Sequence, residues 1–106
     1  MTVVLTALAI LLPVSQQADY RWRVVRPYNA KLERMARCEW GYSTPRWHGN
    51  THNGFYGGLQ FTLSTWRSVR GRGYPHRHSK LEQKYRAVLV IKRAHGYSDW
   101  PICGKA

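Results

Sequence analysis

The hydrophobic pattern predicts a helix from Asn29 to about Trp40. Apolar side chains recur there with the three- and four-residue spacing of one helix face. Asn29 suits the cap position at the start, and Gly41 suits the residue that ends a helix. A carboxyl group, Glu39, falls on this apolar face. The face consists of Leu32, Met35, Ala36 and Glu39.

The same pattern predicts two further helices. The first begins at a candidate cap, Thr62, and ends before Gly71. The second follows Ser79, which has the capping-box spacing to Glu82, and ends at Gly96. Because the second is apolar on more than one side, we expect it to be the central buried helix. The inward residues are Leu63, Trp66 and Val69 in the short helix and Leu81, Tyr85, Val88, Leu89 and Ile91 in the long one.

The segments between these helices are rich in glycine and polar residues. Residues 40–53 have no periodicity and are predicted to form a loop. Residues 53–61 combine an Asn-Gly turn, paired glycines and flanking aromatic residues, which predicts a short β-hairpin. The paired glycines, Gly57 and Gly58, would let a ligand approach the backbone closely. The expected fold is therefore mainly helical (α+β), with one small hairpin.

The first 28 residues lie outside this pattern. Residues 1–18 are an uncharged apolar run that ends at Ala18, which favours a signal peptide, although a basic n-region is missing and Gln16 is a poor residue near the cleavage site. A short apolar leader or anchor is the alternative, but the run is too short to span a bilayer comfortably. Residues 19–28 are basic and aromatic without periodicity, which predicts an extended arm or disorder. One domain is expected over residues 29–106.

Composition favours an acidic polymer as the partner. Seventeen Lys and Arg against five Asp and Glu give a formal net charge of +12, which suits nucleic acid, an anionic membrane or a bacterial wall. Five Trp and seven Tyr suit stacking on bases or on sugar rings. A candidate basic surface for an anionic polymer, or merely a solvated face, consists of Arg67, Arg70, Arg72, Arg77 and Lys80.

The chain has two cysteines, Cys38 and Cys103. A bond between them would close a loop of about 66 residues and stabilise a small domain by on the order of 4 kcal/mol. Such a bond is typical of a secreted protein. Two unpaired buried thiols are the alternative, because spacing alone does not establish pairing.

Few acidic residues are available for chemistry. Asp19 lies in the arm, Glu33 lies among basic residues of its helix, and Glu82 has a capping role. Glu39 remains, with Asp99 in an exposed-looking turn as the other candidate. Burial on an apolar face raises the pKa of a carboxyl group, as a general acid near neutral pH requires. Most glycosidases use two carboxyl groups, so a single-carboxyl mechanism is favoured if the chain cuts a glycan; without a family argument, such a lone glutamate is more often structural.

A series of short motifs runs in a fixed order through residues 29–103. The most specific block is Phe-Tyr-Gly-Gly-Leu-Gln-Phe over residues 55–61. The flanking motifs are Arg37-Cys38-Glu39 and Asn53-Gly54 before it, and Ser64-Thr65-Trp66, Gly73-Tyr74-Pro75-His76, Gly96-Tyr97, Trp100-Pro101 and Cys103 after it. Together they resemble the resuscitation-promoting-factor or transglycosylase-like domain of actinobacteria, whose fold is lysozyme-like.

The resemblance implies an activity and its central residues. The family's catalytic glutamate follows the first cysteine, which is Glu39 here, and its disulfide joins the cysteines that match Cys38 and Cys103. The implied reaction cuts the β-1,4 bond between N-acetylmuramic acid and N-acetylglucosamine in peptidoglycan. In a lytic transglycosylase, Glu39 would first protonate the leaving oxygen and then, as a carboxylate, accept the proton of the muramic acid 6-hydroxyl, leaving a 1,6-anhydro end.

The resemblance also implies a substrate cleft beside the hairpin. Gln60, Thr65 and Trp66 match positions that line the family's cleft, where Gln60 and Thr65 would hydrogen-bond sugar hydroxyl or N-acetyl groups. Tyr56 and Trp66 would offer ring faces to a sugar. The alternatives are a core position for Trp66 and packing within the hairpin for Tyr56 and Gln60.

One segment departs from the family pattern. After its glutamate the family usually has Ser or Thr, two glycines, Asn and Trp. This chain instead takes extra residues to reach Asn53-Gly54 and reads Trp40-Gly41-Tyr42-Ser43-Thr44-Pro45-Arg46-Trp47. We therefore expect a different cleft wall beside Glu39.

No cofactor is expected, and the histidines, of which His76 and His78 are the closest pair, lack metal-ligand spacing, so loop histidines are favoured over a metal site. The sequence predicts a monomeric enzyme that acts on peptidoglycan glycan strands and anionic wall polymer, secreted to the cell wall or delivered there by a bacteriophage. The alternatives are a hydrolase of the same bond, with Asp99 or water as the second group, and a non-catalytic glycan-binding module. Nucleic-acid binding is disfavoured because no known binding motif is present.

Overall fold

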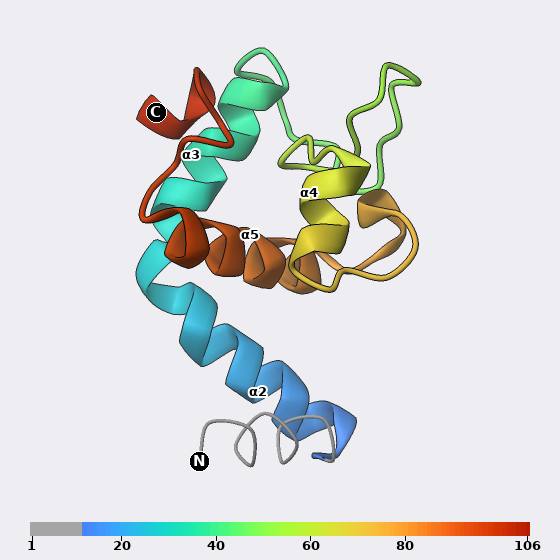
Figure 1. Ribbon diagram of the computed structural model, residues 1–106, viewed down its shortest axis with the longest axis vertical. Helices are drawn as coiled ribbons and strands as arrows, with labels where there is room; N and C mark the ends of the chain where they lie inside the picture. The colour runs from blue at the N-terminus through green and yellow to red at the C-terminus, as the bar shows by residue number, and fades with distance from the viewer. Residues whose placement is uncertain (1–11) are drawn as a thin grey trace.

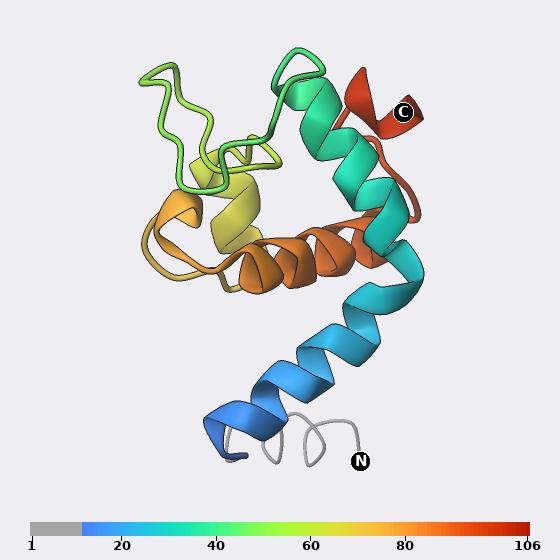
Figure 2. The ribbon, with the colours of Figure 1, turned by 180° about the vertical axis from the view of Figure 1, so that it is seen from behind.

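The computed structural model describes residues 12–106, which fold mainly into helices, as predicted. Helix α5 crosses the middle of the molecule, with α2 on one side of it and α3 and α4 on the other (Figures 1 and 2). The elements are α2 (Val14–Val25), η1 (Arg26–Tyr28), α3 (Asn29–Glu39), α4 (Leu63–Ser68), η2 (Pro75–Arg77), α5 (Lys80–Ala94) and η3 (Cys103–Lys105).

The prediction of an extended arm over residues 19–28 is wrong, because this segment is helical and packs on α5. Arg21 Nε lies 2.6 Å from Glu82 Oε2, and the guanidinium of Arg21 lies 4.8 Å from the ring centroid of Tyr85. The rings of Tyr20 and Tyr85 meet edge to face at 6.1 Å. Since these contacts use cations and aromatic rings rather than an aliphatic stripe, hydrophobic periodicity does not reveal them.

Most of the leader predicted for residues 1–18 lies outside the described residues. Residues 14–18 begin helix α2. None of the helices within residues 12–106 combines the length and the apolar character that crossing a bilayer requires.

Helix α3 has nearly the predicted bounds. Two of its polar side chains, however, bond to lysines of α5 and not to groups of their own helix. Tyr28, not Asn29, occupies the cap position, and Asn29 Oδ1 accepts a hydrogen bond from Lys84 Nζ at 2.6 Å. The carboxylate of Glu33 pairs with Lys80 at 2.7 Å and with Lys84 at 2.5 Å. Burial alone would raise the pKa of Glu33, but the hydrogen bonds and charges of the two lysines outweigh it and lower the pKa. The carboxylate of Glu33 therefore links α3 to α5 instead of pairing with the basic residues of its own helix.

The segment between α3 and α4 forms successive turns, and the predicted β-hairpin is absent. Within residues 12–106 the β-pairing consists of two isolated antiparallel bridges, Asn50 with Tyr56 and Tyr56 with Phe61. The backbone reverses at Gly57 (φ 75°) and again at Gln60 (φ 51°). Because these left-handed residues are three positions apart, no run of extended residues is long enough to form a strand.

The side chain of Gln83 fastens three loop segments to α5. It is fully buried, with 0% exposure. Its Nε2 donates to the carbonyl oxygens of Trp47 (2.8 Å) and His78 (2.9 Å), and its Oε1 accepts from the backbone N–H of Gly58 (3.1 Å). The amide nitrogen and oxygen of Gln83 therefore bond to backbone groups that have no partner in a helix or sheet.

The paired glycines pack against the chain itself. A Cβ atom on Gly57 would lie 2.3 Å from Gln83 Oε1, and one on Gly58 would lie 2.3 Å from Trp47 Cε3. The prediction that these glycines let a ligand approach the backbone is therefore wrong on this side, because Gln83 and Trp47 fill the space.

Two of the three predicted helix caps, Thr62 and Ser79, are present. Thr62 Oγ1 accepts from the N–H of Thr65 at 3.2 Å, and Ser79 Oγ accepts from the N–H of Glu82 at 3.1 Å. The carboxylate of Glu82 bonds to Arg21 on α2 and to Arg86 on its own helix at 2.7 Å. The predicted capping role of the Glu82 side chain is therefore wrong, because its carboxylate joins α2 to α5 instead of bonding back to the N–H of Ser79.

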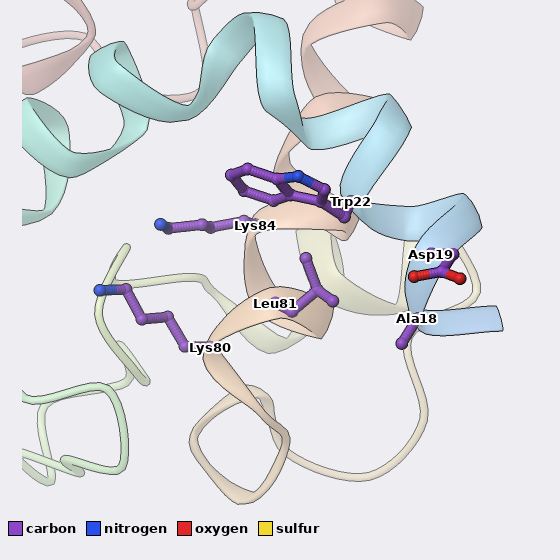
Figure 3. A pocket seen from close by; sticks show the side chains of 6 residues that line it. All are labelled: Ala18, Asp19, Trp22, Lys80, Leu81 and Lys84. Atoms are coloured by element: carbon purple, nitrogen blue, oxygen red, sulfur yellow. The ribbon is translucent and has the colours of Figure 1, made fainter. Parts of the chain in front are cut away.

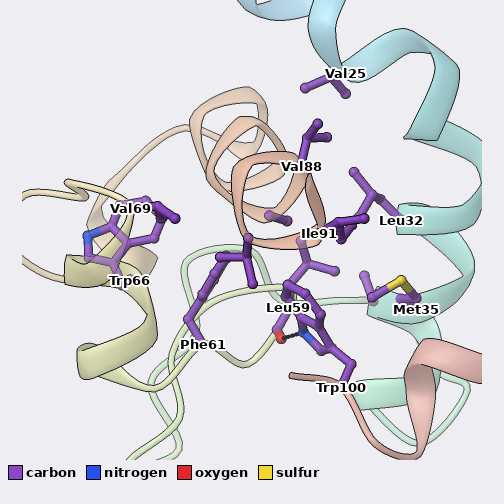
Figure 4. Close-up of a cluster of buried hydrophobic side chains, with 13 residues drawn as sticks. Val25, Leu32, Met35, Leu59, Phe61, Trp66, Val69, Val88, Ile91 and Trp100 are labelled. Carbon is purple, nitrogen blue, oxygen red and sulfur yellow. Dashed lines mark hydrogen bonds between the residues drawn. The ribbon is translucent and has the colours of Figure 1, made fainter. Parts of the chain in front are cut away.

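Helix α5 is the central helix, as predicted, although it ends at Ala94 and not at Gly96. His95 takes the left-handed conformation (φ 54°), and the N–H of Gly96 bonds to the carbonyl oxygen of Ile91 at 2.9 Å. The core packs around this helix (Figure 4). Its larger members are Val25, Leu32, Met35, Leu59, Phe61, Trp66, Val69, Val88, Ile91 and Trp100.

The disulfide between Cys38 and Cys103 is formed, with the two Cα atoms 5.5 Å apart. It joins the last turn of α3 to the C-terminal η3. Two hydrogen bonds hold the same end of the chain: Lys31 Nζ to the carbonyl oxygen of Ala106 at 2.9 Å, and Trp100 Nε1 to that of Leu59 at 2.9 Å (Figure 4). The C-terminus is thus fixed beside the end of α3.

We expect Gln83→Leu to lower the free energy of unfolding by about 2–4 kcal/mol, because it leaves buried backbone groups without partners. Urea unfolding followed by circular dichroism would measure the loss. Gln16→Leu, at an exposed position on α2, is the control and should change stability little. Equal midpoints for the wild type and Gln83→Leu would contradict the role of the amide.

The double variant Cys38→Ser/Cys103→Ser should lose about 2–4 kcal/mol of unfolding free energy, since the closed loop is long. The comparison is with the oxidised wild type in urea. If the reduced wild type and the double variant were both as stable as the oxidised protein, the disulfide would not be what fixes the C-terminus.

Candidate active site

Glu39 is the last residue of α3 and is half-buried. Burial raises the pKa of its carboxyl group. No hydrogen bond or ion pair within residues 12–106 engages this carboxyl, in contrast to those of Glu33 and Glu82. Burial with no cationic partner therefore favours the protonated form of this carboxyl relative to an exposed glutamate, as a general acid requires.

The next residue, Trp40, connects the end of α3 to the loop that carries Gln60. Trp40 Nε1 donates to the carbonyl oxygen of Gly57 at 3.2 Å, and Gln60 Nε2 donates to the same oxygen at 3.0 Å. The carbonyl oxygen of Gly57 therefore holds the side chain of Gln60 close to that of Trp40, the residue that follows Glu39. The sequence indicated Gln60 through the family motif but gave no sign of its link to Trp40.

Gln60 and Thr65 are half-buried and keep hydrogen-bonding capacity. The amide oxygen of Gln60 has no partner in the described part of the chain, since the residue's side-chain bond uses Nε2. Thr65 Oγ1 accepts from Thr62 Oγ1 at 3.0 Å, which leaves its own hydroxyl proton to donate. Both side chains can therefore bond to a polar ligand without breaking a contact.

Trp66 lies in the core, which is the alternative that the sequence left open to a role in stacking on sugar. Its exposure is 0%, and its Nε1 donates to the carbonyl oxygen of Arg72 at 3.0 Å. Its ring meets Phe61 edge to face at 5.2 Å. No ring face of Trp66 is left for a sugar.

Tyr56 is half-buried in an aromatic group of the loops. Its ring stacks on His76, with centroids 5.5 Å apart and an interplanar angle of 19°, and meets the edge of Tyr74 at 5.3 Å. His76 thus covers one face of Tyr56.

The family model for the transglycosylase-like domain matches residues 26–103. The chain belongs to this family. It is 49% identical over 73 residues to the resuscitation-promoting factor Rpf of Micrococcus luteus, covering 69% of this chain and 31% of that protein. It is 40% identical over 78 residues to RpfE of Mycobacterium tuberculosis (74% and 43% covered) and 40% identical over 72 residues to RpfC of the same species (68% and 49%). This transglycosylase-like domain therefore spans less than half the length of these relatives.

The remaining polar candidates of the transglycosylase-like domain have separate places. Asp99 is exposed in the turn before Trp100. His48 Nδ1 donates to the carbonyl oxygen of His76 at 2.9 Å, and His78 Nε2 to that of Arg72 at 2.6 Å. Within residues 12–106 no three His, Cys, Asp or Glu side chains are placed to hold a metal ion.

Two grooves of the domain flank α2 and contain none of the predicted catalytic or sugar-binding residues. One has a volume of about 420 Å³ and is lined by apolar and charged side chains (Figure 3); the other has a volume of about 620 Å³. The first is lined by Ala18, Asp19, Trp22, Lys80, Leu81 and Lys84. The second is lined by Tyr20, Arg23, Val24, Pro27, Tyr28 and Lys92.

We expect the stability difference between Glu39→Gln and the wild type to depend on pH. Because the folded-state pKa of Glu39 lies above its ordinary value of 4.5, its contribution to stability is complete below that value and is lost as the pH rises through the folded-state pKa. Glu39→Gln should therefore unfold at a higher urea concentration than the wild type at about pH 7 and at a similar one at about pH 4.

Asp99→Asn, which alters an exposed carboxyl group, is the control for this pH dependence. A gain for Glu39→Gln that is the same at both pH values, or a loss at both, would show that burial does not destabilise the Glu39 carboxylate.

Proposed function

We propose that this domain is a lytic transglycosylase that cuts the β-1,4 bond between N-acetylmuramic acid and N-acetylglucosamine in peptidoglycan. The observation that carries the proposal is the half-buried, unpaired carboxyl group of Glu39, whose pKa is raised, in a chain of the transglycosylase-like family. Both features suit a general acid, because burial favours the protonated form of the carboxyl and no cation stabilises its carboxylate.

In the proposed reaction Glu39 acts as acid and then as base. Protonated Glu39 gives its proton to the glycosidic oxygen as the bond from that oxygen to the muramic acid anomeric carbon breaks, and the N-acetylglucosamine portion leaves as an alcohol. The Glu39 carboxylate then accepts the proton of the muramic acid 6-hydroxyl, whose oxygen bonds to the anomeric carbon. The product is a 1,6-anhydro end, and Glu39 is protonated again.

The distribution of the acids favours one carboxyl over two. Glu33 and Glu82 are held in ion pairs with cations, and Asp19 lines a groove beside α2. Asp99 remains as the candidate for a second catalytic group. The rival function is therefore a lysozyme-type hydrolase in which Asp99 or a bound water activates the attacking water.

Three further residues are proposed to contact the sugar. The free amide oxygen of Gln60 and the hydroxyl group of Thr65 would bond to hydroxyl or N-acetyl groups, and the face of Tyr56 away from His76 would lie against a ring. Trp66 would not contact the sugar but would fix α4, which carries Thr65, to the core. Both polar groups sit on well-defined backbone, one in a tight turn and one in a capped helix.

We propose that the domain works at the bacterial cell wall. The relatives reported above are bacterial proteins, which favours secretion over delivery by a phage. The exposed arginines of the candidate basic surface would hold anionic wall polymer, except that Lys80, which the sequence placed among them, is paired with Glu33. These arginines are Arg67, Arg70, Arg72 and Arg77.

The deciding experiment is mass spectrometry of the soluble fragments that the full, oxidised chain releases from purified peptidoglycan. We expect 1,6-anhydro-muramic acid ends from the wild type and from Asp99→Asn, and a rate at least about 100-fold lower from folded Glu39→Gln.

Other outcomes would replace the proposal. Free reducing ends that disappear in Asp99→Asn would establish the two-carboxyl hydrolase. No fragments above the Glu39→Gln background, together with retained binding to insoluble peptidoglycan, would establish a non-catalytic glycan-binding module.

A further inference from the structure

The segment after Glu39, which departs from the family pattern, forms a packed platform. The indole of Trp40 is bonded at its nitrogen to the carbonyl oxygen of Gly57, and the backbone of Gly49 lies against its ring. A Cβ atom on Gly49 would lie 2.7 Å from Trp40 Cη2 and 3.0 Å from Arg46 Cβ. The N–H of Gly49 also donates to the carbonyl oxygen of Arg46 at 3.0 Å. Trp40 is therefore fixed at its nitrogen and along its ring.

The guanidinium of Arg46 lies over this platform and forms no ion pair within residues 12–106. The guanidinium carbon is 5.6 Å from the ring centroid of Trp40, and the residue is exposed. The ion pairs within residues 12–106 use Arg21, Lys80, Lys84 and Arg86 and leave Arg46 without a carboxylate. A guanidinium that rests on an aromatic ring has lost part of its freedom already, so less is lost when its planar N–H groups bind an anion.

We propose that Arg46, supported by Trp40, binds a carboxylate of the glycan substrate next to the bond at Glu39. The recognised chemistry is a carboxylate on or near the muramic acid residue, and its two sources are the lactyl group of a bare sugar and the stem peptide attached to that group. The proposal rests on the proposed function, because it assumes that glycan lies along Glu39. Arg46 would then determine which substrates bind well, without taking part in proton transfer.

The proposed roles require that Arg46 leave the carboxyl group of Glu39 unpaired. Burial is the cause of the raised pKa of Glu39, with no contribution from Arg46. A cation close to the carboxyl would lower that pKa and reduce the fraction of Glu39 that carries a proton. Since Arg46 contacts the ring of Trp40 and forms no ion pair with Glu39 within residues 12–106, the guanidinium can bind an anion without neutralising the Glu39 carboxyl.

The test compares Arg46→Gln and Arg46→Lys with the wild type on three glycan preparations. The first carries stem peptides, the second has had them removed by an amidase and exposes lactyl carboxylates, and the third has its carboxylates converted to neutral amides. Arg34→Gln, which alters an exposed arginine on α3 that forms no ion pair within residues 12–106, is the matched control.

For Arg46→Gln we expect KM to rise about tenfold on at least one of the two carboxylate-bearing preparations, with kcat changed less than about twofold. The preparation that is affected identifies the source of the carboxylate. Arg46→Lys should retain part of the affinity, because it keeps the charge but loses the planar pair of donors. On the amidated glycan the wild type and Arg46→Gln should have the same KM, and Arg34→Gln should match the wild type on all three.

An unchanged KM for Arg46→Gln on both carboxylate-bearing preparations, or an equal rise on the amidated glycan, would overturn the proposal. Failure of the proposed function is recognised separately. Free reducing ends would indicate a hydrolase, for which the KM comparison still applies, whereas for a glycan-binding module the wild type would release no fragments. In that case calorimetric binding of the same preparations to Glu39→Gln and to Glu39→Gln/Arg46→Gln decides the role of Arg46, since equal affinities would exclude it.

Discussion

The buried amide of Gln83 holds the long loop of this molecule, and the candidate active site depends on that loop. Residues 40–61 contain neither helix nor sheet, so their backbone groups need other partners when they are buried. Gln83 bonds to two points of this loop and to the loop before α5. Gln83 also packs against Gly57. It therefore helps to position the carbonyl oxygen of Gly57, which accepts hydrogen bonds from Trp40 and Gln60.

The few acids of the chain serve two different purposes. Glu33 and Glu82 join α3 and α2 to α5 through ion pairs, which adds to the small core and the disulfide in stabilising a short chain. Glu39 has no such partner within residues 12–106 and is half-buried, so its charged form is disfavoured. With a formal net charge of +12, cations are abundant on the surface, yet none neutralises the one carboxyl on which the proposed chemistry depends.

One part of the candidate site matches the motifs of the family, and another part differs from the family pattern. The motif residues Glu39, Gln60 and Thr65 lie at the end of α3, in a turn and in a capped helix, where the backbone fixes their positions. The segment from Trp40 to Arg46 differs from the family pattern and lies directly after the glutamate. Variation in such a loop changes which substrate groups are recognised while the chemical group stays in place.

The sequence by itself determined the helices that have an aliphatic stripe or a side-chain cap, α3, α4 and α5, because these signals are local. Through the motifs it also determined the family, the disulfide and Glu39 as the candidate acid. Only the tertiary structure decided that residues 19–28 are helical, that the hairpin is replaced by turns, and that Trp66 belongs to the core. It also decided the contacts of Gln83 and Trp40. These features depend on partners far away in the chain, Tyr85 and Glu82 for α2 and Gln83 for the glycine turn, and no local pattern specifies contacts of that kind.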